Sequence, residues 1–142
     1  MKSITKTPLL PMLIATAALI TGASLATAAD IHVKLVGSEE TPPVSTTATG
    51  VGTITIAADK SVSGSIKTTG IDGTVAHIHL GAPGDAGPPI ITLTKGENGA
   101  WSVPAGSKLS NEQYTSFKSG NLYVNVHSAE HKAGEIRGQL KP

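Results

Sequence analysis

Hydrophobic and polar residues alternate with a period of two through most of the chain beyond residue 30, and clusters of Gly, Pro, Asp and Ser interrupt the alternation. Successive side chains of a β-strand point to opposite faces, so this pattern predicts short antiparallel strands that each bury one face. The chain is therefore predicted to be all-β, with an antiparallel sandwich or barrel. We expect strands at residues 31–35, 50–56, 61–67, 74–80, 90–94, 100–103, 121–127 and 135–140.

One segment, residues 110–118, departs from this period and has the signals of a short helix. Ser110 is a typical N-cap, and Gln113 stands three residues later, where it completes a capping box. Gly120 follows the segment and is expected to end the helix. The predicted fold thus contains one short helix.

The first 29 residues have the three-part pattern of a secretory signal peptide. A positively charged start with Lys2 and Lys6 is followed by an apolar run over residues 9–20 and then by small residues. The apolar run is shorter than the ~20 residues that a membrane-spanning helix needs. We therefore expect cleavage after Ala28 or Ala29 and no transmembrane segment afterwards. Export would place the mature protein in the periplasm, at the cell surface or outside the cell.

The mature part, residues 30–142, is long enough for one hydrophobic core and too short for two ordinary domains. The chain has no cysteine, which excludes disulfides and thiol nucleophiles. Two of the 11 Lys and Arg residues lie in the signal, so the remainder nearly balance the 10 Asp and Glu residues. Near-neutral charge and few aromatic residues argue against a nucleic-acid partner. No Gly-x-Ser-x-Gly elbow or phosphate-binding loop is present, so no catalytic residue is predicted.

Histidines gather on the predicted strand faces that point away from the core. His77 and His79 alternate on one strand, and His127 shares a face with Tyr123 and Asn125 on a later strand. Alternate residues of a strand are ~6.6 Å apart and neighbouring strands ~4.8 Å apart, so three imidazoles can converge if the two strands pair. Imidazole nitrogens are common ligands of copper and zinc. The pattern predicts a metal site, with solvated histidines that bind no metal as the alternative.

Other polar residues near these strands have two interpretations each. His131 stands in the turn that follows and is either a fourth metal ligand or an ordinary polar loop residue. Glu135 and Arg137 share one face of the last strand, which favours a structural ion pair, or an Arg137 that orients an anion. Glu39 and Glu40 precede two prolines and indicate a rigid connector.

Three motifs follow one another along the mature chain: LxGxxExPPV at residues 35–44, AHIHxGxxGxxGP at residues 76–88, and GNLYVNVH at residues 120–127 with GEIRGQL at residues 134–140. Together they resemble the CHRD domain, named from chordin. The resemblance covers nearly all of the mature chain. It implies an immunoglobulin-like β-barrel in an exported or surface-associated bacterial protein, and it implies no established common activity.

A fainter resemblance is to the copper/zinc superoxide dismutases, in which a His-x-His strand, a later histidine and a C-terminal arginine surround the metal. His77, His79, His127 and Arg137 follow that order. The chain lacks the dismutase cysteine pair, and no histidine lies between His79 and His127 to complete a second metal site. A single ion is therefore the most that this resemblance implies.

These observations leave three functions open. The first is a non-enzymatic exported module that binds a protein or a surface component, as the CHRD resemblance implies. The second is a periplasmic or secreted protein that binds copper or zinc through His77, His79 and His127. The third is an enzyme that disproportionates superoxide, in which Arg137 steers the anion to a copper ion.

Overall fold

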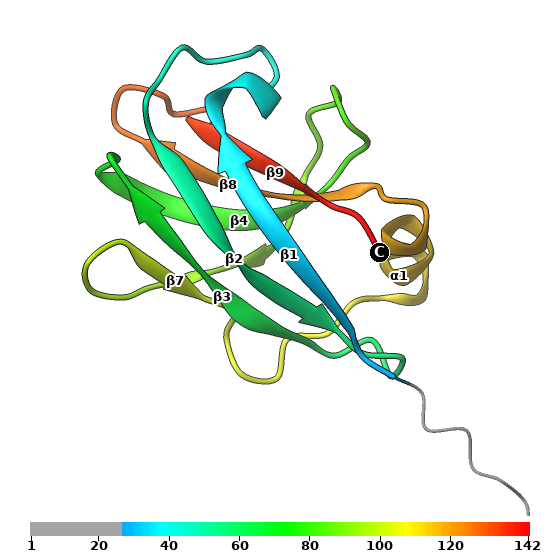
Figure 1. The fold of residues 1–142 in the computed structure, drawn as a ribbon. Helices are drawn as coiled ribbons and strands as arrows, with labels where there is room; N and C mark the ends of the chain where they lie inside the picture. Colours follow the sequence, from blue (N-terminus) through cyan, green and yellow to red (C-terminus); the bar gives the residue numbers. More distant parts are fainter. Residues whose placement is uncertain (1–26) are drawn as a thin grey trace, which may run out of the picture.

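A computed structural model describes residues 27–142 of the chain. The predicted signal peptide, residues 1–29, lies outside the described residues except for its last three. The described part forms nine strands and one α-helix, which confirms the predicted all-β class (Figure 1). The elements are β1 Ala29–Val36, η1 Gly37–Glu39, β2 Thr49–Ile56, β3 Val62–Thr69, β4 Gly73–Leu80, β5 Pro89–Thr92, β6 Thr94–Lys95, β7 Ala100–Ser102, α1 Asn111–Lys118, β8 Leu122–Ser128 and β9 Ile136–Leu140.

All nine strands belong to one antiparallel sheet, in the order β5-β4-β8-β9-β1-β2-β3-β7-β6. Its two outermost strands, β5 and β6, are consecutive stretches of chain separated only by Leu93. The Leu93 amide donates a hydrogen bond of 2.9 Å to the carbonyl of Ala76 in β4, so the sheet curls into a nearly closed barrel (Figure 1). The prediction of one strand over residues 90–94 is therefore wrong, because this stretch pairs with β4 before Leu93 and with β7 after it.

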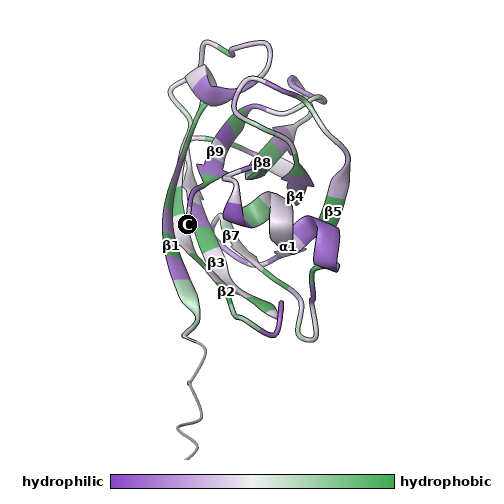
Figure 2. Ribbon diagram, turned by 90° about the vertical axis from the view of Figure 1, so that its right-hand side faces the viewer, coloured by the Kyte–Doolittle hydropathy of each residue, from purple (hydrophilic) through white to green (hydrophobic). Residues whose placement is uncertain are grey.

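The hydrophobic core fills the barrel. Leu35 of β1, Ile54 of β2, Ile78 of β4 and Val124 of β8 are fully buried, because each strand turns every second residue inward. Phe117 of α1 belongs to the same core. In Figure 2 the helix lies between β1 and β5, across the opening that the strands frame, so it covers one side of the core.

The helix begins and ends at the predicted residues. The Ser110 hydroxyl accepts a hydrogen bond of 3.1 Å from the Gln113 amide, and the Gln113 side chain accepts one of 2.8 Å from the Ser110 amide. This reciprocal pair is the predicted capping box. Gly120 has a φ of +75°, a conformation that glycine adopts without strain, and the helix stops before it.

A second, polar interior lies on the other side of β4, β8 and β9. The alternation predicted that Tyr123, Asn125 and Arg137 face away from the hydrophobic core, and they do, yet only 3%, 2% and 1% of these residues is exposed. Arg137 donates hydrogen bonds to the carbonyls of Ala82 and Asp85, in the loop over residues 81–88. The alternation predicted which residues lie on this face but not that a loop folds back over it and buries them.

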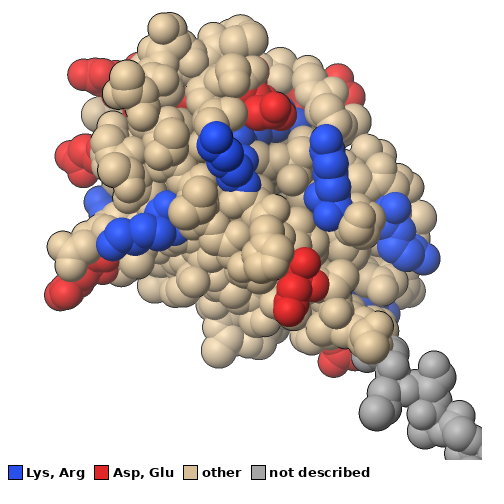
Figure 3. All heavy atoms as spheres, in the orientation of Figure 1, with Lys and Arg blue, Asp and Glu red and all other residues tan. Residues whose placement is uncertain are grey.

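The surface carries charges of both signs. On the face in Figure 3, basic and acidic side chains are interspersed and no broad patch of one sign is visible. This agrees with the nearly balanced composition of 11 Lys and Arg against 10 Asp and Glu. Among residues 27–142, no helix has the length and apolar character needed to cross a membrane.

Candidate metal centre

The strands that carry the predicted histidines are neighbours. β4 pairs with β8 in a register that sets His77 opposite Asn125 and His79 opposite Tyr123, with His127 opposite Val75. This confirms the strand pairing on which the predicted cluster depends. All three histidines project to the polar side of the sheet, because side chains at alternate positions share a face.

The three imidazoles form a compact group. One nitrogen from each of His77, His79 and His127 lies within 4.8 Å of the other two. The closest approach is a hydrogen bond of 3.2 Å, in which His77 Nδ1 donates to the lone pair of His127 Nε2. Two ligands at ~2.0–2.1 Å from one ion in a tetrahedral arrangement lie ~3.4 Å apart. The nitrogens of His77 and His127 thus lie near the spacing of two ligands that share one ion. The third nitrogen, from His79, lies within 4.8 Å of both.

Backbone carbonyls fix the tautomers of two of the imidazoles. Nδ1 of His79 lies 2.7 Å from the carbonyl oxygen of Gly87, and Nδ1 of His127 lies 2.7 Å from that of Lys132. A carbonyl only accepts hydrogen bonds, so both Nδ1 atoms carry the proton and both Nε2 atoms keep a lone pair. Nε2 of His79 is buried and has no hydrogen-bond partner. Metal-binding histidines commonly have this second hydrogen bond.

Burial favours the neutral form of His77 and His79. Loss of solvent is the largest effect on His77 and lowers its pKa, and the nearby His127 and His79 lower it further. Burial also lowers the pKa of His79, against the opposing effect of its bond to Gly87. Neutral imidazoles are the form that binds metal ions, so the site is ready for a cation near neutral pH.

The side chains of Tyr123 and Arg137 pack beside His79. The Tyr123 ring lies nearly parallel to the His79 imidazole, with centroids 4.7 Å apart, and the Arg137 guanidinium carbon lies 3.5 Å from the centroid of the tyrosine ring. The Tyr123 hydroxyl accepts a hydrogen bond of 3.1 Å from the Gly87 amide. Arg137 also holds the carbonyls of Ala82 and Asp85, each at 2.8 Å. Hydrogen bonds to Tyr123 of β8 and Arg137 of β9 thus hold the loop that orients His79 against the sheet.

Arg137 has neither of the partners that the sequence favoured. Glu135 forms no salt bridge with it; the Glu135 carboxylate accepts a hydrogen bond of 2.7 Å from Thr46. Arg137 donates hydrogen bonds to two loop carbonyls and to the Gln139 side chain, and only 1% of it is exposed. It is therefore a loop anchor, and an incoming anion does not meet it.

His131 lies apart from the three-histidine group. Its backbone closes the turn after β8, where its amide donates to the Ser128 hydroxyl and its carbonyl accepts from Gly134. Burial raises the pKa of Glu135, but hydrogen bonds from Ser128 and Thr46 and the charge of His131 outweigh it and lower that pKa overall. The His131 side chain thus acts on Glu135, and the polar loop interpretation describes it better than that of a ligand.

Sequence reasoning missed the part that Glu40 plays. The two glutamates before the prolines differ: Glu39 is exposed, whereas only 6% of Glu40 is exposed and its carboxyl group lies beside Asn125. Asn125 was placed on the right face but given no role. The burial of a carboxylate in an otherwise polar connector has no signature in composition, because Glu40 is brought to β8 by tertiary folding alone.

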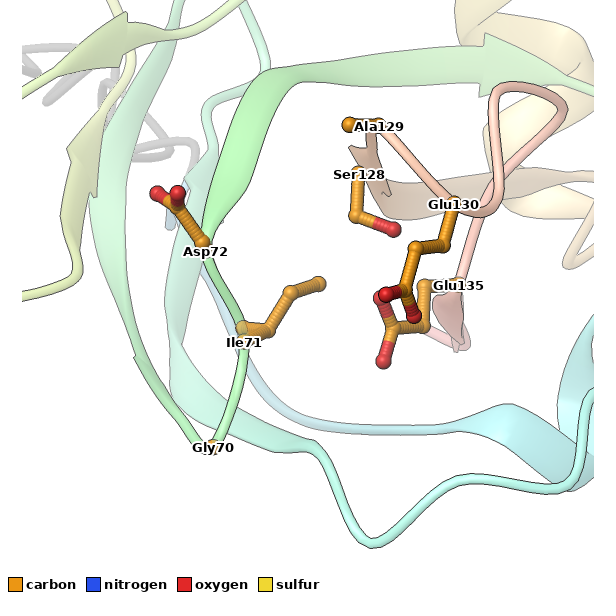
Figure 4. A pocket seen from close by; sticks show the side chains of 7 residues that line it. All are labelled: Gly70, Ile71, Asp72, Ser128, Ala129, Glu130 and Glu135. Carbon is orange, nitrogen blue, oxygen red and sulfur yellow. The ribbon is translucent and has the colours of Figure 1, made fainter.

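One hollow in the described part of the chain lies away from the three histidines. A cavity of about 260 Å³ is lined by Gly70, Ile71, Asp72, Ser128, Ala129, Glu130 and Glu135. Figure 4 shows the Glu130 and Glu135 carboxylates side by side in it, with Asp72 turned away. None of the three clustered histidines lines this hollow. The candidate metal site therefore consists of side chains that converge between the polar face of the sheet and the loop that covers it.

Comparison with known proteins gives one match. The family model described as the CHRD domain matches residues 31–140, which is more than half of the chain. No curated protein and no solved structure matches the chain. The matched range begins in β1 and ends with β9, so it spans the whole barrel.

Proposed function

Because the chain belongs to the CHRD family, we propose that it is an exported, non-enzymatic CHRD module whose ligand is a single copper or zinc ion. The ion would bind His77 through Nδ1 and His79 and His127 through Nε2. Imidazole suits both metals, and three protein ligands leave one position of a tetrahedral ion open. The module would capture and hold the ion outside the cytosol.

The fixed tautomers of His79 and His127 are the observation that supports this proposal best. Each gives its Nδ1 proton to a backbone carbonyl at 2.7 Å, and each turns a lone pair toward the same small volume. A cation satisfies both lone pairs at once, and it would replace the 3.2 Å hydrogen bond between His77 Nδ1 and His127 Nε2. The sequence pattern alone contains no information on these carbonyls, so this support is independent of the prediction.

The alternative of ordinary solvated histidines explains the site less well. A solvated histidine has water at the nitrogen that the protein leaves free, but only 7% of His79 is exposed and its Nε2 is buried without a partner. Buried polar atoms are nearly always paired in folded proteins. A metal ion supplies the missing partner of His79.

The enzymatic alternative lacks the guide for the anion that the sequence suggested. A positively charged group beside the ion speeds the approach of superoxide. Arg137, however, is buried against Tyr123 and the loop carbonyls. We therefore propose binding without turnover. Metal-loaded protein that removes superoxide faster than the same amount of free copper would contradict this.

Export by the predicted signal, residues 1–29, is part of the proposal. Ala29 is the first residue of β1 and pairs with Ile56 of β2. Cleavage after Ala28 would leave this strand whole, whereas cleavage after Ala29 would remove its first residue. We therefore expect a mature protein that begins at Ala29. N-terminal sequencing of the exported protein tests this expectation.

Metal titration of the mature protein tests the proposed ligand. We expect one copper(II) or zinc(II) ion per chain by calorimetry and elemental analysis, and loss of this ion in the double variant His77→Ala/His79→Ala. His32→Ala and His131→Ala are matched controls that remove one imidazole outside the cluster, and both should bind one ion. Failure of the unmodified protein to bind an ion stoichiometrically, or unchanged binding in the double variant, would refute the proposal.

A further inference from the structure

Three buried polar atoms without hydrogen-bond partners lie along one line of contacts. They are Oε1 of Glu40, Oδ1 of Asn125 and Nε2 of His79. Trp101 Nε1 is the one other such side-chain atom in residues 27–142. Because folded proteins pair nearly all buried polar groups, three unpaired atoms together indicate a missing partner at this place.

Asn125 connects the other two residues. Its side chain is a hydrogen-bond partner of the Glu40 carboxyl group, and it also lies close enough to His79 to favour the protonated form of that imidazole. In the register of the sheet Asn125 stands directly opposite His77 and two positions before His127 on β8. The amide is thus beside all three predicted ligands.

Glu40 determines which end of the amide faces the histidines. Burial raises the pKa of Glu40, whereas the charge of Arg137 and the Asn125 side chain favour its ionised form. The ionised carboxylate only accepts hydrogen bonds, so it binds the Asn125 amide through Nδ2 and turns Oδ1 away from itself. The backbone permits this close contact at Gly134, where an added Cβ would collide with Glu40 Oε1 and lie 2.6 Å from Asn125 Nδ2. Oδ1 is left on the side of the histidines, with no donor to bind.

Two acceptors therefore meet in a buried place. His79 carries its proton on Nδ1, so its Nε2 is a lone pair, and Asn125 Oδ1 is a carbonyl oxygen. Neither atom can donate to the other, and neither reaches a donor elsewhere. A metal cation that contacts both atoms resolves this arrangement, as does a water molecule that donates to both, and metal titration distinguishes the two.

We infer that Asn125 Oδ1 is the fourth donor of the metal centre and that Glu40 is the positioning residue that keeps this oxygen, rather than the amide nitrogen, turned toward the ion. The inference rests on the proposed function and names the complete ligand set: three imidazole nitrogens and one amide oxygen. Amide oxygens occur as weak axial ligands in copper proteins, so this donor set suits a copper(II) ion.

The donor set also selects the oxidation state of the metal. Copper(I) prefers soft sulfur ligands, whereas imidazole and carbonyl oxygen suit divalent ions. The chain has no cysteine, and its two methionines are Met1 and Met12, so residues 27–142 contain no sulfur. The centre is therefore selective for copper(II) or zinc(II) over copper(I).

Two variants test the fourth donor. Asn125→Leu replaces the amide by an apolar side chain of similar size, and Glu40→Gln replaces the carboxylate by a group that can also donate, which frees the Asn125 amide to rotate. Loss of an outer metal-site partner typically weakens metal binding ~10–100-fold. We expect a loss of this size in copper(II) affinity for both variants, together with a changed electron paramagnetic resonance spectrum of bound copper(II).

Glu39→Gln is the matched control, because it removes the same charge from the exposed neighbouring residue. It should leave the affinity and the spectrum unchanged. Copper(I) affinity, measured anaerobically by competition with a chelator, should be lower than copper(II) affinity in the unmodified protein and change less in the variants. Circular dichroism establishes that each variant is folded, and either folded variant suffices for the test.

The outcomes separate this inference from the proposed function. One outcome is that copper(II) binds stoichiometrically with the same affinity and spectrum in all three variants, Asn125→Leu, Glu40→Gln and Glu39→Gln. This result would refute the assignment of Asn125 as the fourth donor and would leave the proposed three-histidine site intact. Tighter binding of copper(I) than of copper(II) would overturn the selectivity. An unmodified protein that binds neither ion would refute the proposed function itself.

Discussion

The imidazole of His79 and the phenol ring of Tyr123 are stacked, with ring planes 9° apart and centroids separated by 4.7 Å. Both side chains are also joined to Gly87, His79 through the carbonyl and Tyr123 through the amide. One residue of the loop thus fixes the rotation of the imidazole and the position of the ring behind it. The predictions that follow treat this loop as part of the metal centre.

Arg137→Ala should destabilise the protein and loosen the loop. The substitution removes the guanidinium donors from the carbonyls of Ala82 and Asp85, and Ala82 keeps only its bond from the Asp85 amide. Hydrogen bonds to charged groups contribute about 1.5–3 kcal/mol each. We expect the free energy of unfolding in urea to fall by about 3 kcal/mol and metal affinity to fall with it.

Arg137→Lys should recover only part of this loss, because an ammonium group cannot reproduce the planar fork of the guanidinium. Lys34→Ala, which removes a charge from an exposed position on β1, serves as the control and should change stability little. An Arg137→Ala protein as stable as this control would show that the loop does not depend on the guanidinium.

Tyr123→Phe should keep the stack on His79 and remove only the hydroxyl that accepts from Gly87. A typical internal hydrogen bond contributes about 1 kcal/mol, so we expect a loss of that order in the free energy of unfolding. Tyr114→Phe on α1 is the matched control. Denaturant unfolding of the two variants under the same conditions measures the difference, and equal stability would mean that the Gly87 contact is unimportant.

Stability and metal retention should both decrease in mild acid. Burial lowers the pKa of His77 and His79 in the folded protein below the ordinary value of 6.5. Below pH 6.5 the unfolded chain therefore binds more protons than the folded chain, and folding becomes less favourable as the pH falls toward the lowered values. Protons also compete with a metal ion for the same nitrogens.

Urea unfolding of the metal-free protein at a series of pH values from 7.5 to about 5 measures this effect. The variant His77→Asn/His79→Asn should show a flatter dependence, because it has lost both imidazoles. A metal-free protein whose stability rises between pH 6.5 and 5.5, with no difference from this variant, would contradict the assignment of neutral buried histidines.

Ser110→Ala should weaken the one helix. The substitution removes the hydroxyl that accepts from the Gln113 amide, and loss of such an N-cap costs about 1 kcal/mol. Ser116→Ala, inside the same helix, is the control and should not destabilise the protein, since alanine is the better helix former. Thermal unfolding of both variants provides the comparison. Equal melting temperatures would show that the cap contributes little.

Local rules were sufficient for most elements of the fold, with the division at Leu93 as an exception. The period of two identified the strands because each buries one face, and the Ser110–Gln113 pair identified the helix start because the cap is a local interaction. The same period placed His77 and His79 on the face shared with His127. These parts depend on neighbours in sequence or on one strand pairing.

The surroundings of the site could not be predicted in the same way. The carbonyls that bind Arg137 lie more than fifty residues away in sequence, and Glu40 reaches Asn125 from a connector of different composition. A period of two distinguishes two faces of a strand but does not say whether a loop covers the polar one. The division at Leu93 was missed for a similar reason, since both halves are strand-like and only their partners differ.

The closure of the barrel at Leu93 has a consequence for the protein at high concentration. An exposed sheet edge is a row of unpaired amides and carbonyls onto which another chain can add a strand, and this is how many β-proteins begin to aggregate. Here the two edges are only 4 and 2 residues long, and they adjoin each other along the chain. A molecule built in this way offers a second copy almost no template for fibril growth.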